Sequence, residues 1–190
     1  MPQASTNEIR SGMKVEIDNS PYLVISNEFV KPGKGQAFNR IRVKNFLTGR
    51  TIEKTYKSGE KLDLADVEET RMRLLYQEQD GAVFMNDDTF EQVTVPFTVL
   101  KDNRKWLKDD LVYDLILYKR EVIDLIPPTF MELKVTQTDP GVRGDTASGR
   151  VLKPATLETG AQIQIPIFVD QDETIKIDTR TSEYVSRVQS

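Results

Sequence analysis

One lysine in this chain has neighbours that would leave its amine exposed. Lys34 lies within Lys31-Pro32-Gly33-Lys34-Gly35-Gln36-Ala37-Phe38, with a glycine on each side. Glycine allows positive φ and a tight turn, while Pro32 fixes its own φ and favours an extended Lys31. The pattern predicts a loop that presents the Lys34 cation at its tip. Hairpin tips also carry glycine and lysine for the turn alone, so a plain solvated tip stays open as an alternative.

The chemistry open to Lys34 is limited by its surroundings. The loop is not a nucleotide-binding P-loop, because Gly35 follows the lysine where Ser or Thr is needed, and Glu28 stands where the first glycine belongs. A lysine that acts as a nucleophile or a general base needs apolar cover that favours the neutral amine. A glycine-flanked tip offers little such cover. We therefore favour a role in binding, and keep an enzyme that uses Lys34 as a third hypothesis.

A second group of cations follows the loop. Arg40, Arg42 and Lys44 alternate with Ile41 and Val43, so a strand would place the cations on one face and the aliphatic side chains on the other. Such a face could bind phosphates, with salt-dependent affinity from counterion release. The cations that could extend it are Lys31, Lys34 and Lys54. An ordinary half-solvated strand is the alternative.

The composition excludes several classes of chemistry. The 190 residues include neither cysteine nor histidine, which removes disulfides, thiolate nucleophiles, Cys/His zinc sites and imidazole acid–base catalysis. The adjacent Asp87 and Asp88 fit a turn better than a metal site. The first ten residues lack the apolar core of a signal peptide, and no apolar run approaches the about 20 residues that span a bilayer. We expect a cytoplasmic monomer that binds neither membrane nor metal.

The apolar pattern predicts an all-β protein. Most apolar runs have period two and end at Gly, Pro, Asn or Asp, which is typical of small antiparallel barrels or sandwiches. One short helix is expected at Asp102–Asp110, around Trp106. Changes of charge near residues 59–61 and the pair Pro127-Pro128 indicate boundaries. They divide the chain into three barrels of similar size, residues 1–62, 63–128 and 129–190.

Charge is distributed unevenly over these segments. Residues 1–62 carry 11 Lys and Arg against 6 Asp and Glu, residues 63–128 carry 8 against 15, and residues 129–190 carry 7 against 9. A basic first segment beside an acidic second one is typical of a protein whose one end meets a polyanion. Nucleic acid is the obvious polyanion, although chance could produce the same difference in small domains.

The last segment offers further candidates for binding single-stranded nucleic acid. Gly144, Asp145 and Thr146 lie in a glycine-rich turn after a strand, and Tyr184 and Arg187 lie near the end of the chain. Loops and strands of small barrels bind single strands through stacking, backbone amides and Arg contacts. A core tyrosine and a solvated arginine are the alternative interpretation of the last two.

Taken together, these residues resemble the bacterial translation elongation factor P family. The resemblance runs in collinear order over nearly the whole chain. The matching strings are residues 29–38, 47–49, 53–58, 84–86, 89–92, 138–141, 144–147, 153–157, 178–180 and 184–187.

The resemblance implies an SH3-like first domain, two OB-like domains and an L-shaped, tRNA-like arrangement. It implies a factor without catalytic residues or a cofactor, which binds the ribosome between the peptidyl and exit tRNA sites, positions peptidyl-tRNA and relieves stalling at consecutive prolines. Lys34 matches the tip residue that many members extend by a modification such as β-lysylation, so a modifying enzyme is a further expected partner. Gly144, Asp145 and Thr146 would contact the exit-site codon region, and Tyr184 and Arg187 would face the ribosome.

The chain departs from the family pattern at two places. Ser182 stands where the family usually has glycine, and Arg150-Val151-Leu152 makes the loop before Lys153-Pro154 slightly longer and bulkier than usual. A lysine at the tip is compatible with β-lysylation, with another modification or with none. A general single-stranded RNA-binding barrel protein remains the second hypothesis, because cations and OB-like patterning favour it as well.

Overall fold

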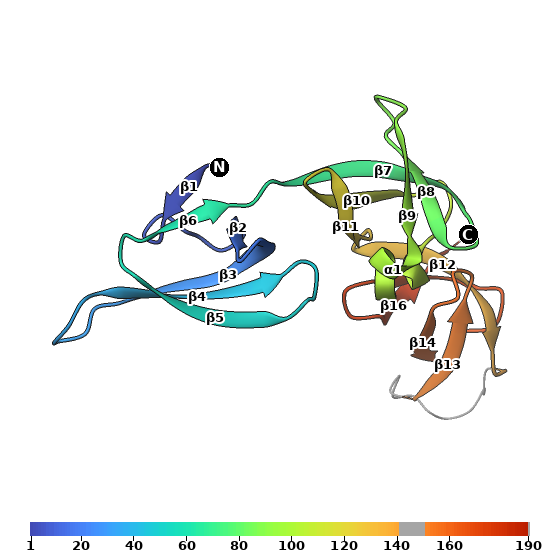
Figure 1. The fold of residues 1–190 in the computed structure, drawn as a ribbon. Coiled ribbons are helices and arrows are strands. Elements are labelled where there is room, and N and C mark those ends of the chain that lie inside the picture. The colour runs from blue at the N-terminus through green and yellow to red at the C-terminus, as the bar shows by residue number, and fades with distance from the viewer. Residues whose placement is uncertain (141–150, 190) are drawn as a thin grey trace. The chain divides into compact units, whose positions relative to one another are not determined.

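The computed structural model of the protein describes residues 1–140 and 151–189. Strands dominate this part of the chain and form three antiparallel sheets, so the predicted all-β class is confirmed (Figure 1). The chain separates into two compact units, residues 1–70 with 115–124, and residues 71–114 with 125–190. The division into segments 1–62, 63–128 and 129–190 stays a prediction.

The first sheet has the strand order β1-β6-β2-β3-β4-β5. Its inner face packs around fully buried Ile9, Val15, Ile41 and Val43. Ile41 and Val43 alternate with exposed charged residues along their strand, as a two-residue period requires. The strands are β1 (Gln3–Ser5), β2 (Lys14–Ile17), β3 (Ser20–Val30), β4 (Phe38–Asn45), β5 (Thr51–Lys57) and β6 (Lys61–Leu64).

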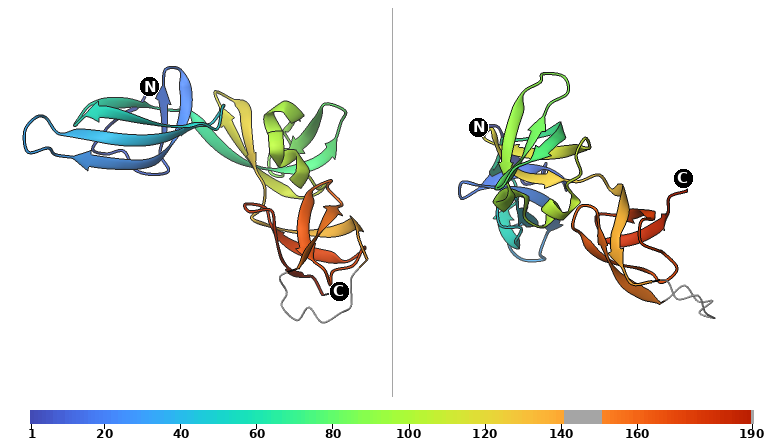
Figure 2. Two further views of the ribbon diagram at one scale, coloured as in Figure 1. Left: turned by 90° about the horizontal axis from the view of Figure 1, so that it is seen from below. Right: turned by 90° about the vertical axis from the view of Figure 1, so that its right-hand side faces the viewer.

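The ribbon made of β3 and β4 extends beyond β2. The register of β3 with β4 runs from Tyr22 opposite Asn45 to Val30 opposite Phe38, whereas β2 accompanies β3 only from Ser20 to Leu23. Figures 1 and 2 show the connection between β3 and β4 as a hairpin loop at the free end of this ribbon. Residues 31–37, including the predicted tip, form that loop.

The second sheet has the order β11-β10-β7-β8-β9. Its strands are β7 (Val67–Gln77), β8 (Gly81–Met85), β9 (Gln92–Pro96), β10 (Val112–Tyr118) and β11 (Glu121–Ile126). The turn between β10 and β11 belongs to the first unit, where the Tyr118 hydroxyl donates to the buried Glu16 carboxylate at 2.8 Å. A buried carboxylate needs such a donor, so this bond ties the turn to β2.

The third sheet has the order β14-β13-β12-β15-β16. Its core contains the fully buried Leu133, Ile165 and Ile175, and it also receives Trp106 from outside the sheet. The strands are β12 (Phe130–Thr138), β13 (Leu152–Leu157), β14 (Gln162–Pro166), β15 (Thr174–Asp178) and β16 (Glu183–Arg187).

The predicted helix at Asp102–Asp110 lies earlier in the chain than expected. One turn of α-helix, α1 (Phe97–Leu100), leads into a 3₁₀ helix, η1 (Lys101–Trp106), and Leu107 is already extended. Tyr113 explains the early end, because its hydroxyl donates to the Trp106 carbonyl at 2.6 Å and accepts from the Lys108 amide at 2.8 Å. These backbone groups are thereby satisfied without a continued helix.

No helix in the described ranges is long and apolar enough to cross a bilayer.

Candidate functional site

The Lys34 loop leaves its cations exposed, as its residue types predict. Lys31, Gly33 and Lys34 are all exposed, whereas Pro32 is half-buried. Of the two flanking glycines only Gly35 uses the left-handed region, with φ of 112°. A Cβ at Gly35 would lie 3.8 Å from Pro32 Cγ, an ordinary contact, so the backbone torsion rather than lack of space favours glycine there.

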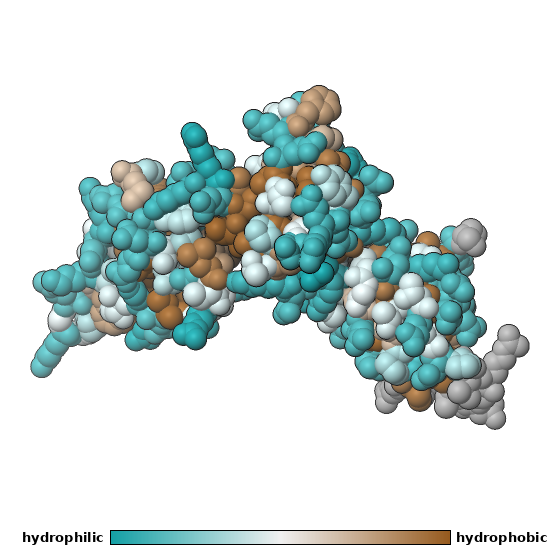
Figure 3. Space-filling model, turned by 45° about the vertical axis from the view of Figure 1, so that its right-hand side comes forward, coloured by the Kyte–Doolittle hydropathy of each residue, from teal (hydrophilic) through white to brown (hydrophobic). Residues whose placement is uncertain are grey.

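Lys34 has no hydrogen-bond or ion-pair partner among the described residues. Figure 3 shows hydrophilic side chains at the free end of the β3–β4 ribbon. A hydrated ammonium of this kind can donate hydrogen bonds to phosphate or carbonyl oxygens, whereas nucleophilic attack would need apolar cover that the loop does not supply. The arrangement supports contact with a polyanion.

The outer face of β4 carries the three expected cations. Arg40, Arg42 and Lys44 are exposed, while Ile41 and Val43 between them are completely buried. The alternation therefore places the charged side chains on one side of the ribbon, in the strand that leads away from the Lys34 loop.

Two carboxylates reduce the charge of this face. Arg40 lies 3.7 Å from Glu28 on β3 and 3.5 Å from Glu53 on β5, and all three side chains are solvated. Such exposed pairs contribute only about 0–1 kcal/mol, so a phosphate could replace either carboxylate. Arg42 and Lys44 have no ion pair within the described part of the chain.

Lys54 does not lie on the outer face that carries Arg40, Arg42 and Lys44. The β4–β5 register sets Lys54 opposite buried Ile41, so it projects from the other side of the sheet. Its ammonium donates to Asp18 at 3.0 Å, and this hydrogen bond raises the pKa of Lys54. The alternation of residue types within β5 could not predict on which side of the sheet Lys54 lies, because the face that a strand presents depends on its register with the neighbouring strand.

The candidates near the end of the chain lie partly within the core. Tyr184 packs against the core of the third sheet and meets Phe168 edge to face, with ring centroids 6.5 Å apart, and burial raises the pKa of its hydroxyl. Arg187 lies over the same Phe168 ring at 4.7 Å and donates to the Phe168 carbonyl at 2.7 Å. The part of Tyr184 and Arg187 in binding stays a prediction. The other candidates of this segment, Gly144, Asp145 and Thr146, lie outside the described residues.

The structure describes both places at which the chain departs from the family pattern, the second only in part. Ser182 adopts φ of 59°, in the left-handed region where glycine has no steric cost, so the backbone here would favour the glycine that the resemblance led us to expect. Val151 and Leu152 are exposed, and Arg150 lies outside the described residues.

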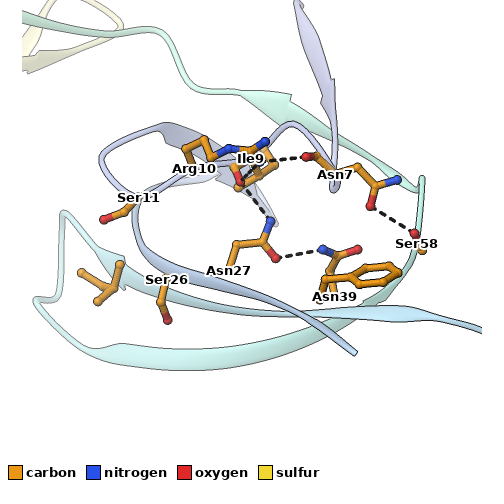
Figure 4. A pocket seen from close by; sticks show the side chains of 10 residues that line it. Asn7, Ile9, Arg10, Ser11, Ser26, Asn27, Asn39 and Ser58 are labelled. Atoms are coloured by element: carbon orange, nitrogen blue, oxygen red, sulfur yellow. Dashed lines mark hydrogen bonds between the residues drawn. The ribbon is translucent and has the colours of Figure 1, made fainter. Parts of the chain in front are cut away.

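Sequence reasoning did not find a hollow in the first unit, beside the inner face of the β3–β4 ribbon. Figure 4 shows the side chains that surround it. The lining residues are Asn7, Ile9, Arg10, Ser11, Ile25, Ser26, Asn27, Phe29, Asn39 and Ser58. The only signal in the sequence is the polar Asn39, which stands at an inward position of β4 where the alternation calls for an apolar residue.

Three family models match almost the whole chain. They are described as the elongation factor P KOW-like domain, at residues 5–62, the elongation factor P OB domain, at residues 67–125, and elongation factor P, C-terminal, at residues 131–187. The protein named elongation factor P 2 from Protochlamydia amoebophila is 62% identical over 190 residues, which is 100% of both chains. The protein named elongation factor P 2 from Chlamydia trachomatis is 60% identical over 188 residues, which is 99% of each chain.

Solved structures show a related fold at low sequence identity. Eukaryotic translation initiation factor 5A from Methanococcus jannaschii has a TM-score of 0.51 at 20% identity, and the match covers 66% of this chain and 99% of that one. A protein described as a translation initiation factor eIF-5A family protein, from Naegleria fowleri, also has a TM-score of 0.51, at 14% identity, over 66% of this chain and 95% of that one. At these identities the likeness concerns the fold alone.

Proposed function

Because the chain belongs to the elongation factor P family, we propose that it binds the ribosome between the peptidyl and exit tRNA sites and stimulates peptide-bond formation on stalled peptidyl-tRNA. Consecutive prolines are the stalls it relieves. The ribosome and peptidyl-tRNA are then its partners, and it works in the cytoplasm as a monomer. The ribosome performs the bond-making step, so the factor itself has neither catalytic residues nor a cofactor.

The observation that carries this proposal is the exposed Lys34 at the end of a paired two-stranded ribbon, where its ammonium has no hydrogen bond or ion pair with any described residue. Cross-strand pairing continues up to Val30 and Phe38, so the loop is held by hydrogen-bonded backbone close to its base. Positioning of reactive groups can lower a barrier without any covalent step. In this mechanism Lys34 contacts the end of peptidyl-tRNA and favours the geometry in which the peptidyl ester reacts.

The cations next to the loop support contact with RNA. Arg40, Arg42 and Lys44 on the outer face of β4 would bind backbone phosphates of the acceptor arm, together with Lys31 and the amides at Gly33 and Gly35. Lys54 would contribute only after leaving Asp18. In the last segment, Gly144, Asp145 and Thr146 would meet the exit-site codon, while Tyr184 and Arg187 would face the ribosome.

We further propose that Lys34 is the position of covalent modification, by β-lysylation or a related reaction. A modifying enzyme needs an accessible amine, and Lys34 is exposed and free of ion pairs within the described residues. An added amine would lengthen the reach of the cation without changing the ribbon. Mass spectrometry of protein purified from its own host would identify the mass added at Lys34.

The decisive test is reconstituted translation of a message with consecutive prolines, with Lys34→Ala compared with the parent protein. We expect the variant to bind ribosomes but to lose on the order of 10-fold or more in the rate of proline–proline bond formation, because misplacement of reacting groups costs up to about 10²-fold.

Lys61→Ala is the matched control, because it removes an exposed cation from the same unit, in β6, and leaves the loop and the outer face of β4 unchanged. A proline-free message controls for general translation. A fully active Lys34→Ala protein would exclude the tip mechanism. Inactivity of the parent protein on ribosomes of its own host, with tight salt-sensitive binding to free RNA, would instead favour the RNA-binding hypothesis.

A further inference from the structure

One aromatic residue of the second unit is exposed at the end of a hairpin. Strands β8 and β9 are paired as far as Met85 opposite Gln92, and residues 86–91 connect them. Figure 1 shows this connection extending beyond the rest of the second sheet. Phe90 lies in it and is 71% exposed. Single exposed apolar residues are common at protein surfaces, so the exposure alone does not indicate a partner.

The backbone at Phe90 has a conformation that phenylalanine rarely adopts. Its φ is 59°, in the left-handed region, where glycine or asparagine is usual in a hairpin loop. A bulky side chain in this region strains the backbone, and such strain is concentrated at functional sites. We therefore expect the ring of Phe90 to contribute through a contact outside the folded chain.

Hydrogen bonds hold the loop in one shape. The Asn86 side-chain oxygen accepts from the amides of Asp88 at 2.9 Å and Thr89 at 3.1 Å. The Asn86 carbonyl accepts from the Phe90 amide at 2.9 Å, and the Asn86 amide donates to the Glu91 carbonyl at 2.9 Å. The loop is thus preorganised, so a partner that binds the ring would order little additional backbone.

The loop is also acidic. Asp87, Asp88 and Glu91 are all exposed. Arg73 of β7 binds Asp87 with two hydrogen bonds, at 3.0 and 2.7 Å. Asp88 and Glu91 have no ion pair within the part of the chain that the structure describes. Carboxylates repel the phosphates of RNA and attract cations, so the surface that this loop meets is basic.

We propose that Phe90 anchors the β8–β9 hairpin in an apolar pocket, rimmed by lysine and arginine, on a protein of the ribosome. The ring fills the pocket, and Asp88 and Glu91 pair with the cations at its rim. The partner is a protein because amino-acid side chains combine an apolar pocket with positive charge, whereas RNA bases are flanked by phosphates. This inference rests on the proposed binding to the ribosome, but not on the role of Lys34.

The first test is photo-crosslinking on purified ribosomes of the host. The full-length protein carries p-benzoylphenylalanine in place of Phe90 or, as the matched control, in place of Tyr76, an exposed aromatic residue of β7 in the same unit. We expect position 90 to form an adduct with one ribosomal protein, at a peptide in which apolar residues adjoin lysine or arginine. An adduct with ribosomal RNA, a dimer formed without ribosomes, an equal yield from position 76, or no adduct would overturn the proposal.

Substitutions of Phe90 give the second test. Phe90→Gly removes the ring and suits φ of 59°, so it should leave the midpoint of urea unfolding unchanged or higher. It should nevertheless weaken ribosome binding by about tenfold or more. Phe90→Asn also tolerates the left-handed region and should weaken binding equally, which separates loss of the ring from added flexibility. Tyr76→Ala is the control, and an equally tight Phe90→Gly protein would exclude the anchor.

The acidic rim has a test of its own. Asp88→Asn should lower the affinity for ribosomes about threefold at low salt, mainly through slower association. Asp80→Asn removes the same charge immediately before β8, at the end of the hairpin away from the tip, and should have no effect. Equal losses from the two variants would show that net charge alone acts, and would overturn the rim contact.

Ribosome binding and stall relief by the parent protein keep the two proposals apart. If the parent relieves proline stalls but position 90 forms no protein adduct, only this inference fails. If position 90 forms the expected adduct but proline stalls persist, only the proposed function fails. A parent protein that does not bind ribosomes would overturn both.

Discussion

At the scale of single residues, the Tyr113 hydroxyl bridges two backbone groups within the second unit. It is 1% exposed, donates to the Trp106 carbonyl and accepts from the Lys108 amide. Tyr113→Phe leaves both groups without this partner, so we expect a loss of about 1–3 kcal/mol in the free energy of unfolding. Urea unfolding at neutral pH measures it, and Tyr76→Phe, at a half-exposed tyrosine, should change it by less than about 0.5 kcal/mol.

The same tyrosine predicts a dependence on alkaline pH. Burial raises the pKa of Tyr113 from 10.0 to about 12. The folded state therefore holds this proton more tightly than the unfolded chain, and the associated stability is present below pH 10 and is lost as the pH rises from 10 to about 12. Tyr113→Phe should remove this component of the pH profile. An unchanged alkaline profile in the variant would contradict the assignment.

At the scale of elements, η1 supplies a core residue to the third sheet. Trp106, its last residue, is 1% exposed and belongs to the cluster formed by residues such as Leu133, Ile165 and Ile175. Both described helices are short, and helices of this length are not stable without tertiary packing. The position of η1 therefore depends on the contact of Trp106 as much as on its own hydrogen bonds. Trp106→Ala should cost about 3–5 kcal/mol through the cavity it leaves.

Circular dichroism during denaturant unfolding measures this effect, because the variant removes the one tryptophan that fluorescence would report. Phe90→Ala is the control for loss of an exposed aromatic side chain. A loss below 1 kcal/mol on Trp106→Ala would show that the third sheet does not need η1.

At the scale of the whole molecule, the uneven charge along the chain makes a prediction about salt. If the first segment meets RNA, Arg42→Glu should weaken ribosome binding and make the salt dependence shallower, by about one unit in the slope of log affinity against log salt. Arg71→Glu changes the net charge equally, at a side chain 80% exposed in the acidic segment, and should leave the slope unchanged. Filtration binding at several salt concentrations compares the two, and equal slopes would show that net charge alone governs binding.

The sequence by itself determined the features that depend on local pattern. Alternation from Arg40 to Lys44 was enough to predict a strand with cations on one face, and the glycines around Lys34 were enough to predict an exposed tip. Both follow from backbone sterics and from a two-residue period, which involve only near neighbours in the chain. Collinear resemblance over nearly the whole length was enough to identify the family.

The tertiary structure decided what depends on distant partners. Lys54 faces away from Arg40 because of its register opposite Ile41, Trp106 lies in a core formed by a later segment, and Asn39 is oriented by Asn27 across the ribbon. Ser182 shows its left-handed φ only in the folded chain. Cross-strand register and side-chain packing join residues far apart in the sequence, and no local period encodes which of them meet.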